Sequence, residues 1–463
     1  MNQKPSSSQD QALGSAPIGK LLFKLSAPAI VAQLVNALYN IVDRIYIGHM
    51  EPDGDLALTG LGVCFAILMF ISALAALAGM GGGPRASIAM GEGDNDKAEA
   101  YLGGSFTRLL VMAVVATAAF QIWKEPLLLA FGADESTIGY ATEYLSVYLW
   151  GSIAVLISLG LNTYITIQGF STTAMCTTLI GAVINIALDP LFIFVFDMGV
   201  KGAALATVIA QVVSALWVLR FLTGKKTLLK IHLRHLRLKP AVIGPIVALG
   251  VSPFIMQATE SLVSISFNSS LLKYGGTTAV GAMTICASVM QVVWLPSQGL
   301  SQGAQPIIGY NFGSGNFDRV KKAFRLQILS LMIYMVAAIL FVELFPGVLV
   351  SLFNNDPALT ATARWAVRIY MSGMAVFWLQ IACQQAFVAL GQAKASLFFA
   401  LFRKVILLIP LIFILPHMFA DQVLGVLIAE PIADVVSALT CGAVFFWRLP
   451  KIIKKRQEVL SHQ

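Results

Sequence analysis

The amino-acid sequence predicts an all-α polytopic membrane protein with 12 transmembrane helices, arranged as two six-helix lobes related by a parallel internal repeat. Three observations support this fold class: an apolar composition, apolar runs of helical length, and a motif shared by the two halves. Of the 463 residues, 57% are hydrophobic and only 12% are charged, whereas about a quarter of the residues in a soluble domain are charged. Most side chains are therefore expected to lie away from water.

Twelve apolar segments follow one another, each long enough to cross a bilayer as a helix of roughly 20 residues. They lie at about 19–48, 56–84, 99–122, 137–168, 174–196, 201–222, 241–272, 278–308, 319–345, 358–390, 396–417 and 422–447. The expected domains are a cytoplasmic tail (1–17), an N-terminal lobe (18–222), a basic cytoplasmic linker (223–240), a C-terminal lobe (241–448) and a second cytoplasmic tail (449–463). The first tail is polar, without signal-peptide character, and is expected to be flexible.

The distribution of Lys and Arg orients these helices. With both termini in the cytoplasm, the cytoplasmic tails, loops and adjacent helix ends hold all but six of the 31 basic residues. The exceptions are Arg44, Lys124, Lys201, Lys273, Arg364 and Arg368. This positive-inside bias predicts a multi-pass protein of the plasma (cell inner) membrane with both termini cytoplasmic.

The net charge of +8 has a simple explanation. Its densest basic run, residues 225–239, lies directly beside membrane spans, where topology and anionic lipid head groups account for it better than nucleic acid does. His232 and His235 lie in this run with no acidic or thiol group nearby in the sequence, and are interpreted as solvated interface residues. The five Cys lie in apolar segments and form no CxxC pair, so neither a metal site nor a cofactor is expected.

One motif occurs in both halves of the chain. Residues 90–98 read MGEGDNDKA and residues 312–320 read FGSGNFDRV, and the two copies are 222 residues apart. Pro84 and Pro306 match at the same separation. Each motif is interpreted as a tight turn whose Asp caps the next helix; no G-x-x-x-x-G-K-[ST] sequence is present, so nucleotide binding is not expected.

An even number of spans in each copy makes the two copies face the same way, related by a pseudo-two-fold axis along the membrane normal. Such halves usually form a cleft that is exposed to alternate sides of the membrane as the lobes rock. The repeat therefore favours a transporter. A channel is less favoured, because neither a selectivity-filter-like loop nor a ring of charges is found.

Polar residues inside the predicted spans indicate a site, because an ionisable group there costs about 2.5–3.5 kcal/mol on insertion scales. The first predicted helix carries Gln33, Asn36, Asn40 and Asp43. Their spacings of three and four residues place them on one face of a helix. That face is expected to meet other protein or a wet cavity.

The fifth predicted helix carries Asn185 and Asp189 four residues apart, followed by Pro190, which bends a helix. Aligning Pro28 with Pro253, at the starts of the first and seventh predicted helices, pairs Asp43 with Asn268. The 222-residue separation pairs Asp189 with Leu411, so the C-terminal lobe lacks both acids. This inequality predicts a special site in the N-terminal lobe. Two nearby carboxylates can take up a proton, or bind Na⁺ when both are ionised.

The C-terminal lobe has charged residues of its own. Glu260 lies in the seventh predicted helix and Glu430 and Asp434 in the twelfth, while Arg403 and Lys404 lie in the eleventh. Internal salt bridges and direct substrate contact are both open for these groups.

Several segments together resemble one transporter family. LYNIVDRIYIG in helix 1, NIALDPLFIF in helix 5, GVKGAALATVIAQ into helix 6 and the repeated Gly-x-Gly loop resemble multidrug and toxic compound extrusion (MATE) transporters of the prokaryotic type, over residues 18–448. The resemblance implies the MATE-like fold and an antiporter that exports lipophilic or cationic compounds in exchange for H⁺ or Na⁺ by alternating access. The implied partners are a small-molecule substrate, the coupling ion and membrane lipid.

The resemblance also assigns roles to residues. The implied cation or proton site comprises Asp43, Asn185, Asp189 and Thr207, with Na⁺ at the first three. The implied substrate pocket comprises Asn36, Tyr39, Asn162 and Glu260, of which Glu260 is only approximately in register with an acid of other branches.

Two other functions fit these residues less well. A flippase or exporter of a lipid-linked or polar anionic substrate would be expected to line its cleft with Arg and Lys, whereas helices 1 and 5 offer Asp and Asn. An intramembrane enzyme is not expected, because the five His all lie in tails, loops or helix ends and no nucleophile–base set is evident.

Overall fold

The structure is a computed structural model that describes residues 8–237, 239–351, 353 and 357–461. The described residues are helical almost throughout and contain no strand, which confirms the all-α class. The N-terminal half contains α1 (Ser8–Ser15), α2 (Ile18–Gly48), α3 (Gly54–Gly91), α4 (Asn95–Ala130), α5 (Ile138–Trp150), α6 (Ser152–Ile167), α7 (Ser171–Pro190), the π-helical η1 (Leu191–Val195), α8 (Gly199–Thr223) and the 3₁₀ turn η2 (Leu233–His235). The C-terminal half contains α9 (Pro240–Ala258), α10 (Glu260–Gly313), α11 (Phe317–Leu344), α12 (Pro346–Ser351), α13 (Pro357–Met371), α14 (Met374–Ala389), α15 (Ala393–Leu401), the π-helical η3 (Phe402–Leu408), α16 (Ile409–Ile414), η4 (Leu415–His417), α17 (Gln422–Leu427) and α18 (Ala429–Ser461).

The helices of the described chain account for the twelve predicted spans. Nine helical stretches are long and apolar enough to cross a membrane, and two bent pairs, α5 with α6 and α13 with α14, bring the number to eleven. One of the nine, Pro240–Gly313, has 74 residues, far more than the roughly 20 that one crossing needs. Its backbone leaves the helical conformation at Gly276 (φ 63°, ψ −161°), which divides it into two spans.

The N-terminal tail differs from its expected flexible state. Residues from Ser8 form α1, and Leu13 is buried in the core of the C-terminal half. Arg319 Nη2 donates hydrogen bonds to the carbonyl oxygens of Leu13 (3.2 Å) and Ala16 (2.8 Å). These bonds satisfy carbonyl groups that the end of a helix leaves without partners, so a residue some 300 positions away anchors the tail.

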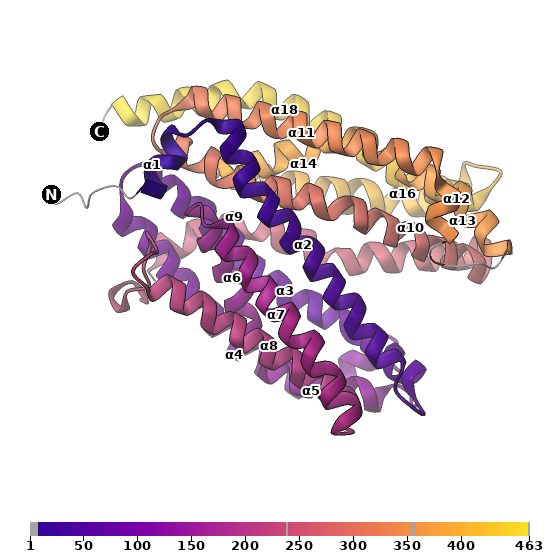
Figure 1. The fold of residues 1–463 in the computed structure, drawn as a ribbon. Helices are drawn as coiled ribbons and strands as arrows, with labels where there is room; N and C mark the ends of the chain where they lie inside the picture. The colour runs from indigo at the N-terminus through magenta and orange to yellow at the C-terminus, as the bar shows by residue number, and fades with distance from the viewer. Residues whose placement is uncertain (1–7, 238, 352, 354–356, 462–463) are drawn as a thin grey trace.

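The helices form two lobes, each with its own hydrophobic core (Figure 1). The N-terminal lobe consists of α2 to α8, and the C-terminal lobe consists of α9 to α18. The first halves of two helices cross between the lobes: Leu21 and Leu25 of α2 are buried in the C-terminal core, while Ile246 of α9 is buried in the N-terminal core. The lobes therefore exchange the starts of their first helices.

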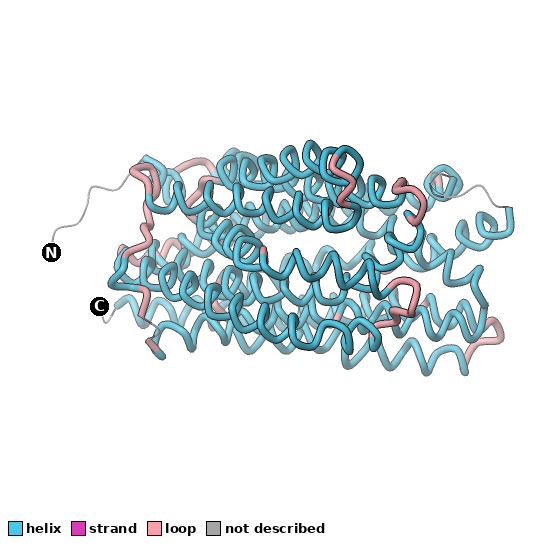
Figure 2. Tube along the Cα trace, turned by 90° about the horizontal axis from the view of Figure 1, so that it is seen from below, coloured by secondary structure: helices cyan, strands magenta, loops and turns pink. Residues whose placement is uncertain are grey.

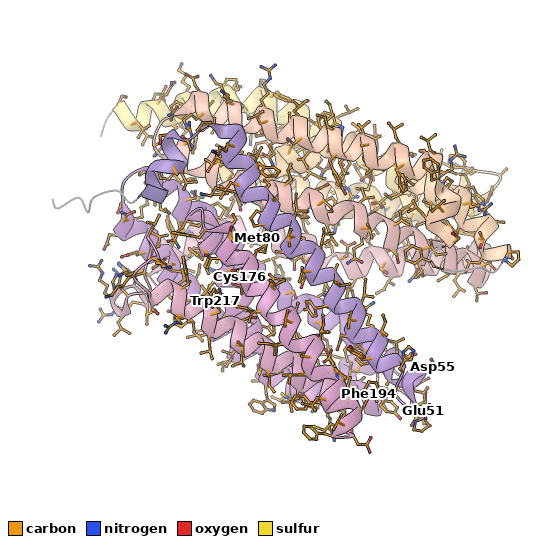
Figure 3. The ribbon with its side chains drawn as sticks, viewed as in Figure 1. Glu51, Asp55, Met80, Cys176, Phe194 and Trp217 are labelled. Carbon is orange, nitrogen blue, oxygen red and sulfur yellow. The ribbon has the colours of Figure 1, made fainter. Side chains whose placement is uncertain are left out.

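The helices run along one common axis, and the loops gather at its two ends (Figure 2). We call the end that carries both termini the terminal end; the repeated loops after α3 and α10 lie there. The other end is the distal end, where Glu51 and Asp55 lie beside the end of α2 (Figure 3). The two lobes diverge toward the distal end (Figure 1).

Residues related by the repeat meet each other at the terminal end. A Cβ atom on Gly313 would lie 3.1 Å from Cα of its repeat partner Gly91. A Cβ atom on Gly309 would likewise lie 3.1 Å from Cβ of its partner Ser87, whose hydroxyl donates to the carbonyl oxygen of Pro306 (3.4 Å). The pseudo-two-fold axis therefore passes between these pairs, and small side chains let the lobes touch around it.

Polar contacts also join the lobes at the terminal end. Arg456 of α18 lies 2.8 Å from Glu92 Oε1 in the first repeated loop, and it donates to the carbonyl oxygen of Gly313 (2.8 Å). Arg85 of α3 donates to the carbonyl oxygen of Gly391 (3.2 Å). As expected, the first copy of the motif forms a turn in which the Asp94 side chain caps α4. The second copy differs, because Asn316 at the start of α11 makes no side-chain capping hydrogen bond.

Close helix packing between the lobes rests on glycine, as in other membrane helices. A Cβ atom on Gly299 of α10 would lie 2.5 Å from Cα and 2.6 Å from the backbone nitrogen of Ile30 in α2. We expect Gly299→Ala to lower the free energy of unfolding by about 1–3 kcal/mol through overpacking, measured by thermal unfolding in detergent. The matched control is Gly244→Ala in α9, because no atom lies within 4 Å of a Cβ there; a Gly299→Ala protein as stable as this control would contradict the close crossing.

Candidate functional site

Four of the residues predicted for the cation or proton site lie together in the N-terminal lobe. Asn185 of α7 donates from Nδ2 to Asp189 Oδ1 (3.1 Å) and to Thr207 Oγ1 of α8 (3.3 Å). The carboxyl group of Asp43, on α2, lies within hydrogen-bonding reach of Asp189. All four residues are buried, with Asp189 fully buried and Asp43 only 8% exposed.

Local backbone structure explains how α7 presents its polar groups. Asn185 and Asp189 are four residues apart and so share one face of the helix. Pro190 ends α7 and the π-helical turn Leu191–Val195 follows it, as a proline that removes a backbone donor favours. The bend that the sequence predicts is therefore located directly after Asp189.

The site has acceptors in excess of donors. Within the described residues, no Lys or Arg forms an ion pair with Asp43 or Asp189. Asp43 Oδ1, Asp189 Oδ2 and Asn185 Oδ1 are buried without a hydrogen-bond partner. Two carboxylates, an amide oxygen and a hydroxyl form a set of oxygen ligands that suits a hard cation, and a proton on one carboxyl would give the pair the donor it lacks.

Two tyrosines on α5 complete the surroundings of the acids, and the sequence did not single them out. Tyr144 and Tyr148 are buried, their rings stack with centroids 6.1 Å apart, and Tyr144 interacts electrostatically with Asp43. Tyr148 interacts in the same way with Tyr39. Their spacing of four residues was the available signal, but it is equally typical of aromatic residues in an ordinary core.

The predicted pocket residues are distributed differently. Tyr39 lies near both carboxyl groups, since it interacts electrostatically with Asp43 and Asp189. Asn36 is half-buried one turn earlier on the same helix, and its carbonyl oxygen accepts a hydrogen bond from Asn40 Nδ2 (2.6 Å).

Asn162 is on α6, and both the nitrogen and the oxygen of its side-chain amide form hydrogen bonds with α7. Its Nδ2 atom donates to the carbonyl oxygen of Ala174 (3.1 Å), and its Oδ1 atom accepts from Thr177 Oγ1 (3.0 Å). In this structure its contacts therefore join two helices of the lobe.

Glu260 lies in the other lobe and forms an ion pair with Lys404. The ammonium group of Lys404 also donates to the carbonyl oxygen of Met256 (2.7 Å). Of the two interpretations that the sequence left open for the C-terminal charges, the structure shows the internal salt bridge at this position.

A second ion-pair cluster lies deeper in the C-terminal lobe. Arg403 donates from Nη2 to Glu430 Oε1 (2.5 Å) and from Nε to Asp434 Oδ1 (2.8 Å), and its guanidinium carbon lies 4.4 Å from the ring centroid of Phe377. The three charged side chains are at most 10% exposed. These buried acids of the C-terminal lobe therefore form ion pairs, whereas Asp43 and Asp189 of the N-terminal lobe form none among the described residues.

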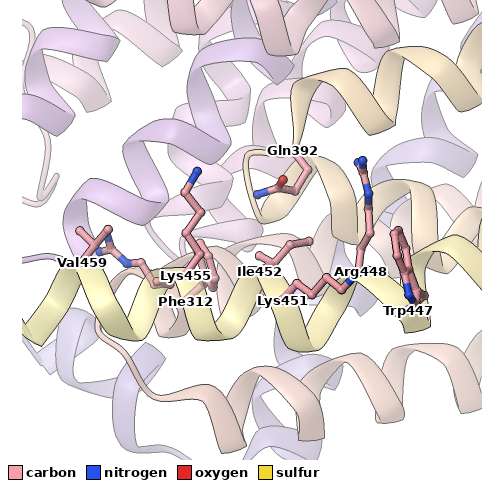
Figure 4. Close-up of a pocket in the computed structure, with 9 residues that line it drawn as sticks. Phe312, Gln392, Trp447, Arg448, Lys451, Ile452, Lys455 and Val459 are labelled. Carbon is pink, nitrogen blue, oxygen red and sulfur yellow. The ribbon is translucent and has the colours of Figure 1, made fainter.

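A separate pocket lies at the terminal end (Figure 4). Its volume is about 490 Å³, and α18 lines most of it with Trp447, Arg448, Lys451 and Lys455, while Gln392 faces them from the loop after α14. Because this lining is basic and lacks carboxyl groups, the pocket is distinct from the buried acid site.

The interpretation of His232 and His235 as residues without acidic partners is wrong. His232 Nε2 lies 3.4 Å from Glu99 Oε2, and His235 Nε2 lies 3.4 Å from Asp96 Oδ1. The linker folds back onto the first turn of α4, which brings together residues more than 130 positions apart in the chain.

Two repeat-related six-helix lobes, joined closely at one end and holding a buried carboxyl pair in one lobe, are typical of a membrane transporter. The sequence pattern of the MatE family matches residues 28–191 and 253–414, one match in each half. The chain belongs to the MatE family. The two matches begin at Pro28 and Pro253, the prolines that align the first helices of the two repeats.

Individual relatives agree with this assignment. Multidrug export protein MepA of Staphylococcus saprophyticus is 25% identical over 443 residues, covering 96% of each chain, and MepA of Staphylococcus haemolyticus is 25% identical over 422 residues, covering 91% of this chain and 92% of its own. Among solved structures, MATE in the bent conformation matches with a TM-score of 0.91 at 24% identity over 98% of this chain and 100% of its own. A MOP superfamily transporter from Pyrococcus furiosus matches with a TM-score of 0.91 at 24% identity over 97% and 99%. These structures confirm the two-lobe fold.

The Arg403 cluster generates a stability prediction. Removing a buried cation leaves its acids uncompensated, at a cost of about 3–5 kcal/mol, so we expect Arg403→Met to lower the thermal unfolding midpoint strongly. Replacing Glu430 and Asp434 with Gln and Asn in the same protein should recover most of the loss. Arg368→Met is the control, because Arg368 is 55% exposed beside Glu343 and such pairs contribute only about 0–1 kcal/mol. Equal midpoints for the two single variants would contradict the assigned role of Arg403.

Proposed function

We propose that this protein is a secondary active antiporter of the plasma membrane, which exports lipophilic or cationic compounds such as drugs in exchange for H⁺ or Na⁺. The observation that carries this proposal is the buried Asp43–Asp189 pair on α2 and α7, which has unpartnered oxygens and forms no ion pair with a Lys or Arg among the described residues. The relatives named multidrug export proteins support the choice of substrate class.

Ion binding at this pair gives a means of coupling. Two ionised carboxylates at hydrogen-bonding distance repel each other, and either a proton or Na⁺ removes that repulsion. Asp43 is carried by α2 and Asp189 by α7, so the ion changes the interaction between these helices. The start of α2 is buried in the other lobe. A shift of α2 against α7 would therefore also change the contacts between the lobes.

The residues around the pair favour a cationic or neutral substrate. Tyr39 and Tyr144 present aromatic rings near the acids, and such rings attract organic cations. The rival anionic substrate would need free Arg or Lys in the membrane interior. In the C-terminal lobe, Arg403 and Lys404 are both bound to carboxylates. In the N-terminal lobe, Arg108 of α4 is buried and forms no ion pair among the described residues, but it interacts electrostatically with Tyr164.

We place the terminal end in the cytoplasm, because the basic linker and the basic end of α18 lie there. With this orientation, the contacts of Arg456 and Arg85 between the lobes close the cytoplasmic side. The lobes diverge toward the opposite side, so the structure corresponds to a state from which substrate is released outward.

Efflux of a fluorescent organic cation from proteoliposomes, under separately imposed pH and Na⁺ gradients, tests the proposal. We expect Asp43→Asn and Asp189→Asn each to reduce gradient-driven efflux at least about tenfold, since each removes a charge that the ion must neutralise. Asp55→Asn is the control, because Asp55 is an exposed acid at the distal end.

Two outcomes would count against the proposal. Full ion-driven efflux by both variants, with insertion into the liposomes verified, would remove the pair from the coupling mechanism. Absence of efflux by the wild-type protein under either gradient would favour the flippase function instead.

A further inference from the structure

The linker between the lobes is fixed to α4 by specific contacts. Thr107 Oγ1 donates to the carbonyl oxygen of Leu236 (2.8 Å). A Cβ atom on Gly103 would lie 2.8 Å from Cβ of His235, so the absence of a side chain lets the linker lie directly against the helix. The η2 turn therefore has a defined position over the first turns of α4.

This arrangement brings two imidazole and two carboxylate side chains together. Asp96 and Glu99 are three residues apart at the start of α4, and His232 and His235 are three residues apart in the linker. Ligand atoms of Asp96, Glu99 and His235 all lie within 4.8 Å of one another. His232 lies beside this group of three rather than within it, with its Nε2 atom 3.4 Å from Glu99 Oε2.

The separations fit a tetrahedral metal ion. Zn²⁺ bonds to imidazole nitrogen and carboxylate oxygen are about 2.0–2.2 Å long, so neighbouring ligand atoms of a tetrahedral site lie roughly 3.3–3.6 Å apart. Both nitrogen–oxygen pairs, His232 with Glu99 and His235 with Asp96, are 3.4 Å apart. Each of these pairs is therefore already spaced as one edge of such a tetrahedron.

One of these ligand atoms is buried without a hydrogen-bond partner. The side chain of His235 is only 9% exposed, and its Nε2 atom is buried without a hydrogen bond. The side chain of Glu99 is 8% exposed, and its Oε1 atom is held by the backbone N–H of Lys230 (3.2 Å), leaving Oε2 toward His232. A buried, unpartnered imidazole nitrogen directed at carboxylates is the arrangement that a metal ion satisfies.

We propose that Asp96, Glu99 and His235 form the core of a binding site for a divalent transition-metal ion, with Zn²⁺ the best fit and the neighbouring His232 turning in as the fourth ligand. Two nitrogen and two oxygen ligands favour this class over Mg²⁺ or Ca²⁺, which prefer oxygen alone. A bound ion fastens the linker to α4 immediately before α9, the helix that crosses into the N-terminal core.

Arg234 holds the acids when no metal is bound. Its Nη2 atom lies 2.6 Å from Asp96 Oδ1 and 3.7 Å from Glu99 Oε2, but its side chain is 64% exposed, so it is free to turn into solvent. The repeat confirms that the fold itself does not require the cluster. In the second copy, Lys321 occupies the position of Glu99, and Asp318 is 98% exposed.

Metal binding to the purified full-length protein in detergent, with no polyhistidine tag, tests the proposal. Zn²⁺ is measured by equilibrium dialysis, and Co²⁺ is added as a spectroscopic substitute whose visible absorption reports tetrahedral ligation. We expect one tight site per chain. The double variant His232→Ala/His235→Ala should bind more than a hundredfold more weakly, since losing two ligands costs more than the roughly 10–100-fold of losing an outer partner.

The matched control removes two other histidines, His49→Ala/His417→Ala, and should keep one site with unchanged affinity. Arg234→Gln should bind more tightly, because it removes the cation that competes for Asp96 and Glu99. Thermal unfolding verifies that each variant is folded. A wild-type protein without a tight site, a folded His232→Ala/His235→Ala protein that binds as tightly as the control, or an Arg234→Gln protein with weaker binding would overturn the proposal.

Discussion

A carboxyl group buried among membrane helices needs a cation, a proton or several donors beside it, because the low-dielectric surroundings do not solvate its charge. In the C-terminal lobe, Arg403 bonds to both Glu430 and Asp434. In the N-terminal lobe, Asp43 and Asp189 form no ion pair with a Lys or Arg among the described residues, although the adjacent Arg44 interacts electrostatically with Asp43. Each of these four acids keeps one oxygen without a hydrogen-bond partner. The protein itself thus supplies a cation to the buried acids of the C-terminal lobe, whereas our proposal assigns an external ion to the N-terminal pair.

This inequality is built on a symmetric scaffold. Repeat-related residues such as Gly91 and Gly313 meet at the terminal end, where both lobes touch around the pseudo-two-fold axis. Helices α2 and α9 each begin in the opposite lobe, so each lobe's first helix links the two cores. A change in charge on α2 is therefore made on an element that both lobes share, and this connection is what makes the N-terminal acids suitable for coupling.

The lengths of the apolar runs predicted the twelve spans, because bilayer thickness sets how many residues one helix needs to cross the membrane. The motif shared by the two halves predicted the two lobes. Helical spacing placed Asn185 and Asp189 on one face, but it could not show that α2 and α8 deliver Asp43 and Thr207 beside them; that came from the family resemblance. Tyr144 was missed because a buried aromatic residue near an acid has the same local pattern as a core residue. The histidine–carboxylate cluster and α1 were missed because their partners lie more than 100 positions away in the chain.

The central claim is that Asp43 and Asp189 form one ion-binding unit without a protein cation. Infrared difference spectroscopy of the purified protein, recorded in Na⁺-free buffer as the pH is lowered, tests it most directly. The account predicts a carbonyl band of protonated aspartic acid in the wild-type protein at low pH. Addition of Na⁺ or a rise in pH should remove this band, and both Asp43→Asn and Asp189→Asn should lack it. An unchanged band in both variants, or its absence from the wild-type protein at every pH where the fold persists, would contradict the account.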